Sequence, residues 1–173
     1  MDKIEQAKDF LRQIGMPQAQ QNDICAYTLL TLANIRPDDE WSQTTNGWIK
    51  IHNILSFCKN FYDKKYAENT RETIRKNCMH QFREGALIED NGKPTNSPNY
   101  MYRITEEALP LLQAYGSKNF TDLLENFYKN HNTLIEKYTS KKKMAGIRKI
   151  YIFTSFGKSH VFIKNASQNN AII

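Results

Sequence analysis

The sequence of 173 residues has no long hydrophobic run. A helix that spans a membrane needs about 20 consecutive apolar residues, and no stretch of the chain approaches that length. Residues 1–15, MDKIEQAKDFLRQIG, form a charged amphipathic pattern without the apolar block of a signal peptide. We therefore expect a cytoplasmic protein that makes no membrane contact.

Cysteine and histidine are also scarce. The three cysteines, Cys25, Cys58 and Cys78, lie far apart among apolar neighbours and form no CxxC motif. The four histidines are equally scattered: His52, His80, His131 and His160. Zinc sites need Cys or His ligands at short, regular spacings. The sequence therefore predicts reduced thiols in a core and no metal site.

The common catalytic motifs are missing as well. The chain contains no GxxxxGK[ST], GxGxxG, GxSxG or HExxH pattern. Nucleases of the PD-(D/E)xK type need carboxylates and a lysine that converge at the edge of a sheet. Asp38 follows Pro37 in a predicted loop, and Asp63 ends a predicted helix before Lys64, so no strand presents either carboxylate. We expect no catalytic residue, no cofactor and no small-molecule substrate in this chain.

Acidic residues are outnumbered, and the imbalance is local. The formal net charge is +6. Residues 1–40 carry four Lys or Arg and seven Asp or Glu, residues 64–83 carry six and two, and residues 136–173 carry eight and one. Two basic blocks suit phosphate binding, because each neutralised phosphate releases condensed counterions. Two solvated basic faces would give the same counts, so charge alone leaves both interpretations open.

Apolar spacing predicts two helices near the N-terminus. Residues 2–14 carry apolar side chains at i, i+3 and i+4 spacing. A second helix can be capped by Asn22 or Asp23, and Pro37 stops it because the residue before a proline disfavours helical geometry. Both helices offer apolar surface to a common core.

The next segment predicts a short strand followed by a third helix. Trp48, Ile49 and Ile51 can form the strand. Residues 52–62 then show helical spacing, with Phe61 among the side chains that we expect to be buried. This strand and helix come directly before the most informative stretch of the chain.

That stretch is ENTRETIRKNCMHQF, residues 68–82. Asn69 followed by Glu72 matches a capping box, so a helix is predicted to begin near Thr70. At 100° per residue, the apolar side chains stack along one side: Ile74, Cys78 and Phe82, with Met79 at the margin. The opposite side is polar and basic, which leaves it available for another partner.

A hairpin follows this helix. Residues 86–89 and 100–104 predict two strands, with Asn91–Gly92 as a turn signal and a long polar tip. The fold class is therefore mainly α with small β hairpins (α+β). The order of elements is that of a winged helix-turn-helix with extra N- and C-terminal helices, in which the second helix enters the major groove.

Two groups of side chains follow from this architecture. The outer face of the helix is predicted to read base edges through Thr70, Thr73, Lys76, Asn77 and His80. The basic residues nearer the packing side and at the hairpin tip are predicted to bind the DNA backbone: Arg71, Arg75, Arg83 and Lys93. A solvated amphipathic helix is the alternative. The coincidence of basic helix, preceding helix and polar hairpin favours DNA binding.

The remainder of the chain predicts a helix from Thr105, a longer helix over residues 121–142, and a second hairpin about Gly157. Three lysines at 141–143 could contact DNA backbone, a dimer surface or only water. The predicted organisation is a winged-helix domain with an N-terminal helix in residues 1–104, a helical extension in residues 105–145, and a hairpin and tail in residues 146–173.

Three stretches resemble the N-terminal region of the BsuBI/PstI family of type II restriction endonucleases: GMPQAQQNDICAYTLLTLANIRPDDEWSQTTN, YAENTRETIRKNCMHQFREGALIEDN and KPTNSPNYMYRIT. The likeness extends over about residues 10–150. It implies a winged-helix-like unit that acts on double-stranded DNA, in a family whose enzymes typically cut CTGCAG with magnesium. The resemblance is compatible with a homodimer on a palindromic site.

The chain also departs from the family pattern. Family members are much longer, and their PD-(D/E)xK half follows where this chain stops, so the family's catalytic residues have no positions here. Mg²⁺ is therefore implied only for the complete family enzyme. We expect that this chain alone binds DNA without cleaving it.

Other interpretations remain open from the sequence. An intact small nuclease would use Asp38 and Asp63. A protein-interaction module would present Trp48, Tyr100 and Tyr102 to a partner. A reader of N6-methyladenine DNA is a variant of the DNA-binding interpretation, although the sequence shows no aromatic cage.

Overall fold

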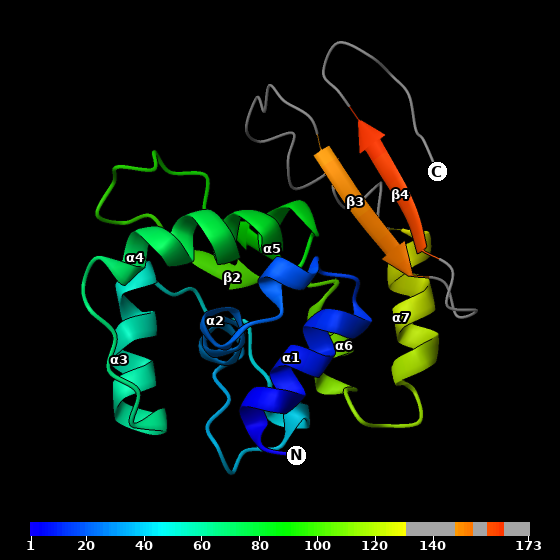
Figure 1. The fold of residues 1–173 in the computed structure, drawn as a ribbon, viewed down its shortest axis with the longest axis horizontal. Helices are drawn as coiled ribbons and strands as arrows, with labels where there is room; N and C mark the ends of the chain where they lie inside the picture. The colour runs from blue at the N-terminus through cyan, green and yellow to red at the C-terminus, as the bar shows by residue number, and fades with distance from the viewer. Residues whose placement is uncertain (131–147, 154–158, 165–173) are drawn as a thin grey trace.

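The computed structural model describes residues 1–130, 148–153 and 159–164. Within these residues the chain is mainly helical, with two separate two-stranded antiparallel sheets (Figure 1). This agrees with the predicted α+β class. None of the described helices is long and apolar enough to cross a membrane.

The first two helices begin at side-chain caps. Helix α1, Lys3–Gln13, starts where the Asp2 carboxylate accepts a hydrogen bond from the Glu5 amide at 2.8 Å. Helix α2, Asp23–Ala33, starts where the Asn22 side chain accepts from the Cys25 amide at 3.0 Å. Asn34 ends α2 in the left-handed conformation, three positions before the proline that was predicted to stop it.

Helix α2 is the centre of the core. It lies between α1, α3 and the helix over residues 70–84, and Figure 1 shows it end-on. Its side chains are buried around most of its circumference rather than along one stripe. The helices that surround it are each amphipathic and direct their apolar stripes inward, so they form one continuous core.

The strand predicted over residues 48–51 is wrong in extent. Ile49 forms a single bridge to Tyr102, with N···O distances of 2.8 Å in both directions, and Ile51 already begins α3. Helix α3, Ile51–Tyr62, confirms the third predicted helix. Phe61, however, is exposed and lies against the Arg36 guanidinium at 4.5 Å.

The helix over residues 70–84 is continuous but irregular. It consists of α4, Thr70–Thr73, a π turn, Ile74–Met79, and α5, His80–Glu84. The predicted capping box is wrong: Asn69 is itself helical, with φ −66° and ψ −15°, and its side chain makes no cap bond. A capping residue needs extended geometry to turn its side chain onto the first amides.

The hairpin after this helix is confirmed. Strands β1, Ile88–Asp90, and β2, Tyr102–Ile104, pair antiparallel with Ile88 opposite Ile104. Both strands are shorter than predicted. β1 begins late because Ala86 takes a left-handed conformation with φ +58° and does not join the ladder. Residues 91–101, here called the wing loop, connect the two strands.

The first of the C-terminal helices is shorter than its pattern. Helix α6, Leu109–Gln113, begins later than Thr105, whose hydroxyl instead accepts from the Ala108 amide at 3.2 Å. Helix α7, Phe120–Lys129, is the described part of the long predicted helix. The lysines at 141–143 lie outside the described residues.

The second predicted hairpin is confirmed. Strands β3, Arg148–Phe153, and β4, Ser159–Lys164, pair antiparallel with Arg148 opposite Lys164. The predicted turn at Gly157 lies outside the described residues. The proposed division of the chain into three parts stays a prediction.

Candidate nucleic-acid interface

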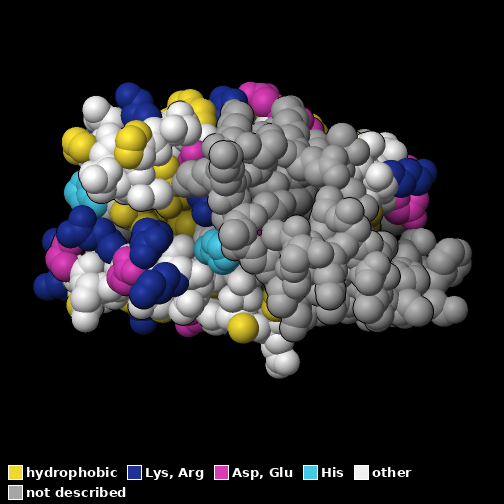
Figure 2. All heavy atoms as spheres, turned by 90° about the horizontal axis from the view of Figure 1, so that it is seen from above, with side chains coloured by type: hydrophobic (Ala, Val, Ile, Leu, Met, Phe, Trp, Pro, Cys, Tyr) yellow, Lys and Arg dark blue, Asp and Glu magenta, His cyan; other side chains and the backbone are white. Residues whose placement is uncertain are grey.

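Basic side chains gather on the face formed by the 70–84 helix, the start of α3 and the wing loop. Figure 2 views the molecule from above the orientation of Figure 1 and shows dark-blue side chains clustered at the left, with acidic ones among them. The exposed basic side chains on these elements are Arg71, Arg75, Lys76 and Lys93. This face is the candidate interface.

The predicted base-reading side chains lie on the accessible side of the 70–84 helix. Thr73, Lys76 and Asn77 are exposed, and Thr70 and His80 are half-buried. The apolar stripe opposite them is buried as predicted, and Met79 belongs fully to it. The structure thus separates the two faces of this helix in the way that its sequence predicts.

The π turn explains why Met79 is inside. A π turn adds one residue to the helical repeat, so Cys78 and Met79 both fall on the packing face. Cys78 Sγ lies 2.8 Å from Cys25 Sγ of α2. The Gln20 side chain donates to the Asn77 carbonyl at 3.1 Å, so a residue from outside the helix supports the irregular turn.

Carboxylates on the 70–84 helix and just before it neutralise the cations of this helix. Arg75 donates twice to Glu72, at 3.0 and 2.6 Å, and Lys76 Nζ lies 3.2 Å from the same carboxylate. These hydrogen bonds lower the pKa of Glu72 to about 2, so it is ionised at neutral pH. Arg71 pairs with Glu68 at 2.5 Å. Glu72 was predicted to be part of a capping box, and its pairing with Arg75 and Lys76 was not predicted.

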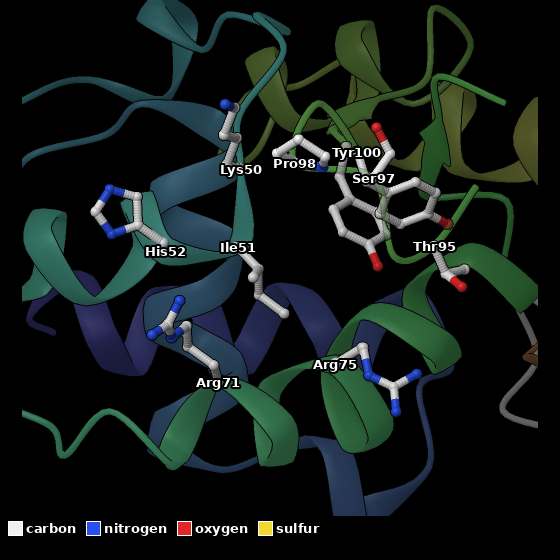
Figure 3. A pocket seen from close by; sticks show the side chains of 10 residues that line it. Lys50, Ile51, His52, Arg71, Arg75, Thr95, Ser97, Pro98 and Tyr100 are labelled. Carbon is white, nitrogen blue, oxygen red and sulfur yellow. The ribbon is translucent and has the colours of Figure 1, made fainter. Parts of the chain in front are cut away.

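A cleft of about 440 Å³ opens between the wing loop, the start of α3 and the 70–84 helix (Figure 3). Figure 3 shows Ile51 near the middle of the view, Tyr100 to one side of it with the residues of the wing loop, and basic or imidazole groups on the other sides. Those groups come from two places in the chain: Lys50 and His52 from the start of α3, where Lys50 is the N-cap, and Arg71 and Arg75 from the 70–84 helix. Lys50 and His52 were not predicted as site residues, although a basic residue at the start of the helix that precedes the 70–84 helix is a signal that the sequence offers.

A second cleft of about 200 Å³ continues along the same helix. It is lined by Lys76, Met79, His80 and Arg83 on the helix side and by Thr95 and two tyrosines on the hairpin side. An apolar floor with cationic edges suits a ligand that combines an uncharged surface with anionic groups. The nucleotide backbone, with its sugars and phosphates, has this composition.

Arg83 is placed differently from the other predicted backbone contacts. Its guanidinium donates to Asp90 at 3.0 Å and to the Tyr100 hydroxyl at 3.1 Å. Burial raises the pKa of Tyr100, and the Asp90 carboxylate adds to the shift. Lys93, by contrast, is exposed in the wing loop.

The aromatic residues of the alternative partner surface do not form one patch. Trp48 is 41% exposed and lies under the Arg103 guanidinium at 4.6 Å. Tyr102 is only 4% exposed, and its ring meets that of Tyr100 edge-on at 5.0 Å. Tyr102 therefore cannot offer its ring to a protein partner.

The acidic residues of the alternative nuclease site stand apart from any sheet. Asp38 lies in the turn after α2, and Asp63 follows the end of α3 with φ +50°. Across residues 1–130 and the two C-terminal strands, no three His, Cys, Asp or Glu side chains form a group that could hold a metal ion.

Comparisons with known proteins agree with this architecture. Residues 1–136 match the model of the BsuBI/PstI restriction endonuclease HTH domain. The chain is 37% identical over 148 residues to the Type II restriction enzyme BsuBI of Bacillus subtilis, which covers 83% of this chain and 47% of that protein. It is 31% identical over 141 residues to the Type II restriction enzyme AplI of Arthrospira platensis, covering 80% and 44%.

The fold is similar to that in the structure of SdaI restriction endonuclease, with a TM-score of 0.71 and 24% identity. That match covers 91% of this chain and 50% of the other. The chain thus spans about half the length of each of these relatives. Because the HTH family model matches residues 1–136, well over half of the sequence, the resemblance is confirmed and the chain belongs to the BsuBI/PstI restriction endonuclease family.

Proposed function

We propose that this chain binds double-stranded DNA in a sequence-specific manner as the DNA-binding part of a type II restriction endonuclease. The observation that carries the proposal is the two-sided 70–84 helix, whose apolar stripe is buried against α2 while its polar, cationic side stays accessible beside the wing loop. A helix of this kind can enter the major groove while the domain holds its orientation.

The docking mode that we propose is that of a winged helix. The 70–84 helix lies in the major groove, and its outer face reads base edges through Thr70, Thr73, Lys76, Asn77 and His80. The hairpin β1–β2 acts as the wing. Arg71, Arg75 and Lys93 contact phosphates, which fix the register of the helix on the duplex.

The type of site is inferred from the family resemblance. A CTGCAG-type sequence bound by a homodimer is the arrangement that we propose, because a two-fold protein matches a palindromic site. Mg²⁺ belongs to the cleavage reaction of the complete family enzyme. The described residues of this chain offer no group of three acidic, Cys or His ligands for it, so we propose binding without cleavage.

Fluorescence anisotropy tests this function. The chain is titrated against three labelled duplexes at several salt concentrations: a CTGCAG duplex, the same duplex with methylated adenine, and a scrambled duplex. We expect tight, salt-dependent preference for one of the CTGCAG duplexes. Equal weak binding to all three duplexes would mean that the interface is a basic surface without sequence preference.

The same samples are incubated with Mg²⁺ and the DNA is examined on a gel. We expect intact DNA. Cutting would overturn the proposed absence of an active site, and loss of that cutting in the Asp38→Asn and Asp63→Asn variants would locate one. Preference for the methylated duplex would identify the chain as a reader of N6-methyladenine.

A further inference from the structure

Arg83 lies in the last turn of the 70–84 helix and reaches the base of the wing loop. Its Nη1 donates to Asp90 Oδ2 at 3.0 Å and to the Tyr100 hydroxyl at 3.1 Å. The Arg83 side chain is 15% exposed and that of Asp90 is 6% exposed. Solvent screens a pair at this depth much less than the exposed ion pairs of the same helix.

Asp90 extends this contact into the wing loop. It is the last residue of β1, and its second oxygen, Oδ1, accepts a hydrogen bond from the Gly92 amide at 2.8 Å. Gly92 has φ +75°, a conformation that glycine adopts without steric cost. One carboxylate therefore binds the helix with one oxygen and the first turn of the loop with the other.

The far end of the wing loop meets the same arginine. Tyr100, two residues before β2, accepts a hydrogen bond from Arg83 through its hydroxyl. The Asn91 side chain closes the loop by donating to the Asn99 carbonyl at 2.7 Å. Both ends of the loop are thus tied to one side chain of the 70–84 helix.

We propose that Arg83 is a positioning residue that locks the wing loop onto the 70–84 helix, so that both elements meet DNA as one preformed surface. The inference rests on the proposed DNA binding and replaces a phosphate contact for Arg83. A surface that is ordered before binding loses less conformational entropy when the complex forms. Because Tyr100 lines both clefts, the lock also sets the position of their shared wall.

Four single variants of the full chain test the lock. Arg83→Gln removes the charge, and Arg83→Lys keeps it. Tyr100→Phe removes only the hydroxyl and leaves the Arg83–Asp90 pair in place, so it folds even if Arg83→Gln is strongly destabilised because the buried Asp90 carboxylate loses its cation. Arg75→Gln is the matched control, because Arg75 is an exposed cation on the same helix.

Hydrogen exchange is measured first, without DNA, on peptides that cover residues 91–101. We expect amide exchange there to rise at least tenfold in Arg83→Gln, to rise less in Tyr100→Phe, and to stay close to wild type in Arg83→Lys and Arg75→Gln. Unchanged exchange in both Arg83→Gln and Tyr100→Phe would overturn the lock. This readout is independent of whether the chain binds DNA.

Affinity is then measured against salt concentration. Loss of a phosphate contact lowers the slope of log K against log salt by about one, as we expect for Arg75→Gln. Loss of a positioning residue weakens binding with the slope unchanged, and we expect a weakening of at least tenfold for Arg83→Gln with recovery in Arg83→Lys. A slope lowered by about one in Arg83→Gln would overturn the inference. Absence of DNA binding by the wild type would instead overturn the proposed function alone.

Discussion

Lys76 tests base reading most directly, because its side chain is 65% exposed at the middle of the 70–84 helix. We expect Lys76→Ala to weaken binding to the preferred duplex by ~1–3 kcal/mol and binding to the scrambled duplex much less, since a base contact carries sequence information. Anisotropy titrations of both duplexes measure the difference.

The matched control for this variant is Lys118→Ala. Lys118 is exposed in the connection between α6 and α7. Figure 1 shows this connection at the bottom of the view and the 70–84 helix at the top. We expect Lys118→Ala to leave the affinities for the preferred and the scrambled duplex unchanged. If Lys76→Ala weakened binding to both duplexes equally and made the salt dependence shallower, Lys76 would contact a phosphate rather than a base. Unchanged binding would show that this helix is not part of the interface.

In contrast to Lys76, Glu72 is expected to weaken DNA binding. Its carboxylate holds Arg75 and Lys76 in the unbound protein, and it adds a negative charge to the face that approaches phosphates. We expect Glu72→Ala to raise affinity for all three duplexes severalfold and to steepen the salt dependence, because two cations become available. Competition titrations at low and moderate salt measure both effects.

A selective loss of affinity for the preferred duplex in Glu72→Ala would contradict this expectation. It would mean that the carboxylate accepts a hydrogen bond from a cytosine amino group, as acidic side chains do in the major groove. Glu68→Ala is the comparison variant, because Glu68 pairs with Arg71 in the same manner one turn earlier.

The sequence predicts the exposure of these side chains better than their partners. Hydrophobic spacing alone places Thr73, Lys76 and Asn77 outside, and the structure agrees. The partner of Arg83 could not be predicted, because Asp90 reaches it only after the chain has turned at Ala86. Long side chains take partners that tertiary geometry decides.

At the scale of elements, the structure distinguishes two asparagines that the sequence presents equally as candidate helix caps. Asn22 caps α2 through its side chain, whereas Asn69 makes no cap bond. We expect Asn22→Ala to lower the free energy of unfolding by about 1 kcal/mol, because the Cys25 amide loses its acceptor. Asn69→Ala should change it by less than ~0.5 kcal/mol, as surface substitutions usually do.

Urea denaturation of the two variants beside the wild type measures this difference. Equal destabilisation by both substitutions would show that Asn69 caps the 70–84 helix after all. The result would also bear on the interface, because a cap at Asn69 requires extended backbone there and would shift the first turn of that helix.

Most elements could be predicted from periodicity, and the exceptions share a cause. The 100° repeat located the buried stripe of the 70–84 helix, but no local signal marks the π turn that draws Met79 inside, because Gln20 and Cys25 contact that turn from other parts of the fold. Strand ends behave likewise: β1 begins only after Ala86 has turned.

At the scale of the whole molecule, the segment after β2 packs into the same core as the helices before it. Phe10 of α1 contacts the rings of Trp41, Tyr115 and Phe120 at centroid distances near 6 Å. The Gln113 side chain donates to the Thr44 carbonyl at 3.0 Å. Residues 105–130 therefore complete the core around α1.

Truncation tests this dependence. We expect a chain of residues 1–104 to lose about 5 kcal/mol or more of unfolding free energy, because it lacks the buried side chains Leu111, Leu112 and Phe120, each contributing ~1.5–3 kcal/mol. A chain of residues 1–130 is the control. Thermal unfolding followed by circular dichroism compares them, and equal melting temperatures would make residues 1–104 an independent domain.

The carboxylates of Glu68 and Glu72 have a consequence for how a DNA-binding protein searches a genome. A specific site competes with about 10⁶–10⁹ non-specific ones, so the time that a protein spends bound to each wrong sequence adds up over the genome. Cations that are already paired within the helix contribute less to sequence-independent attraction. On the proposed function, the protein therefore spends less time on each wrong sequence, and the ion pairs of its free state shorten the search for the right one.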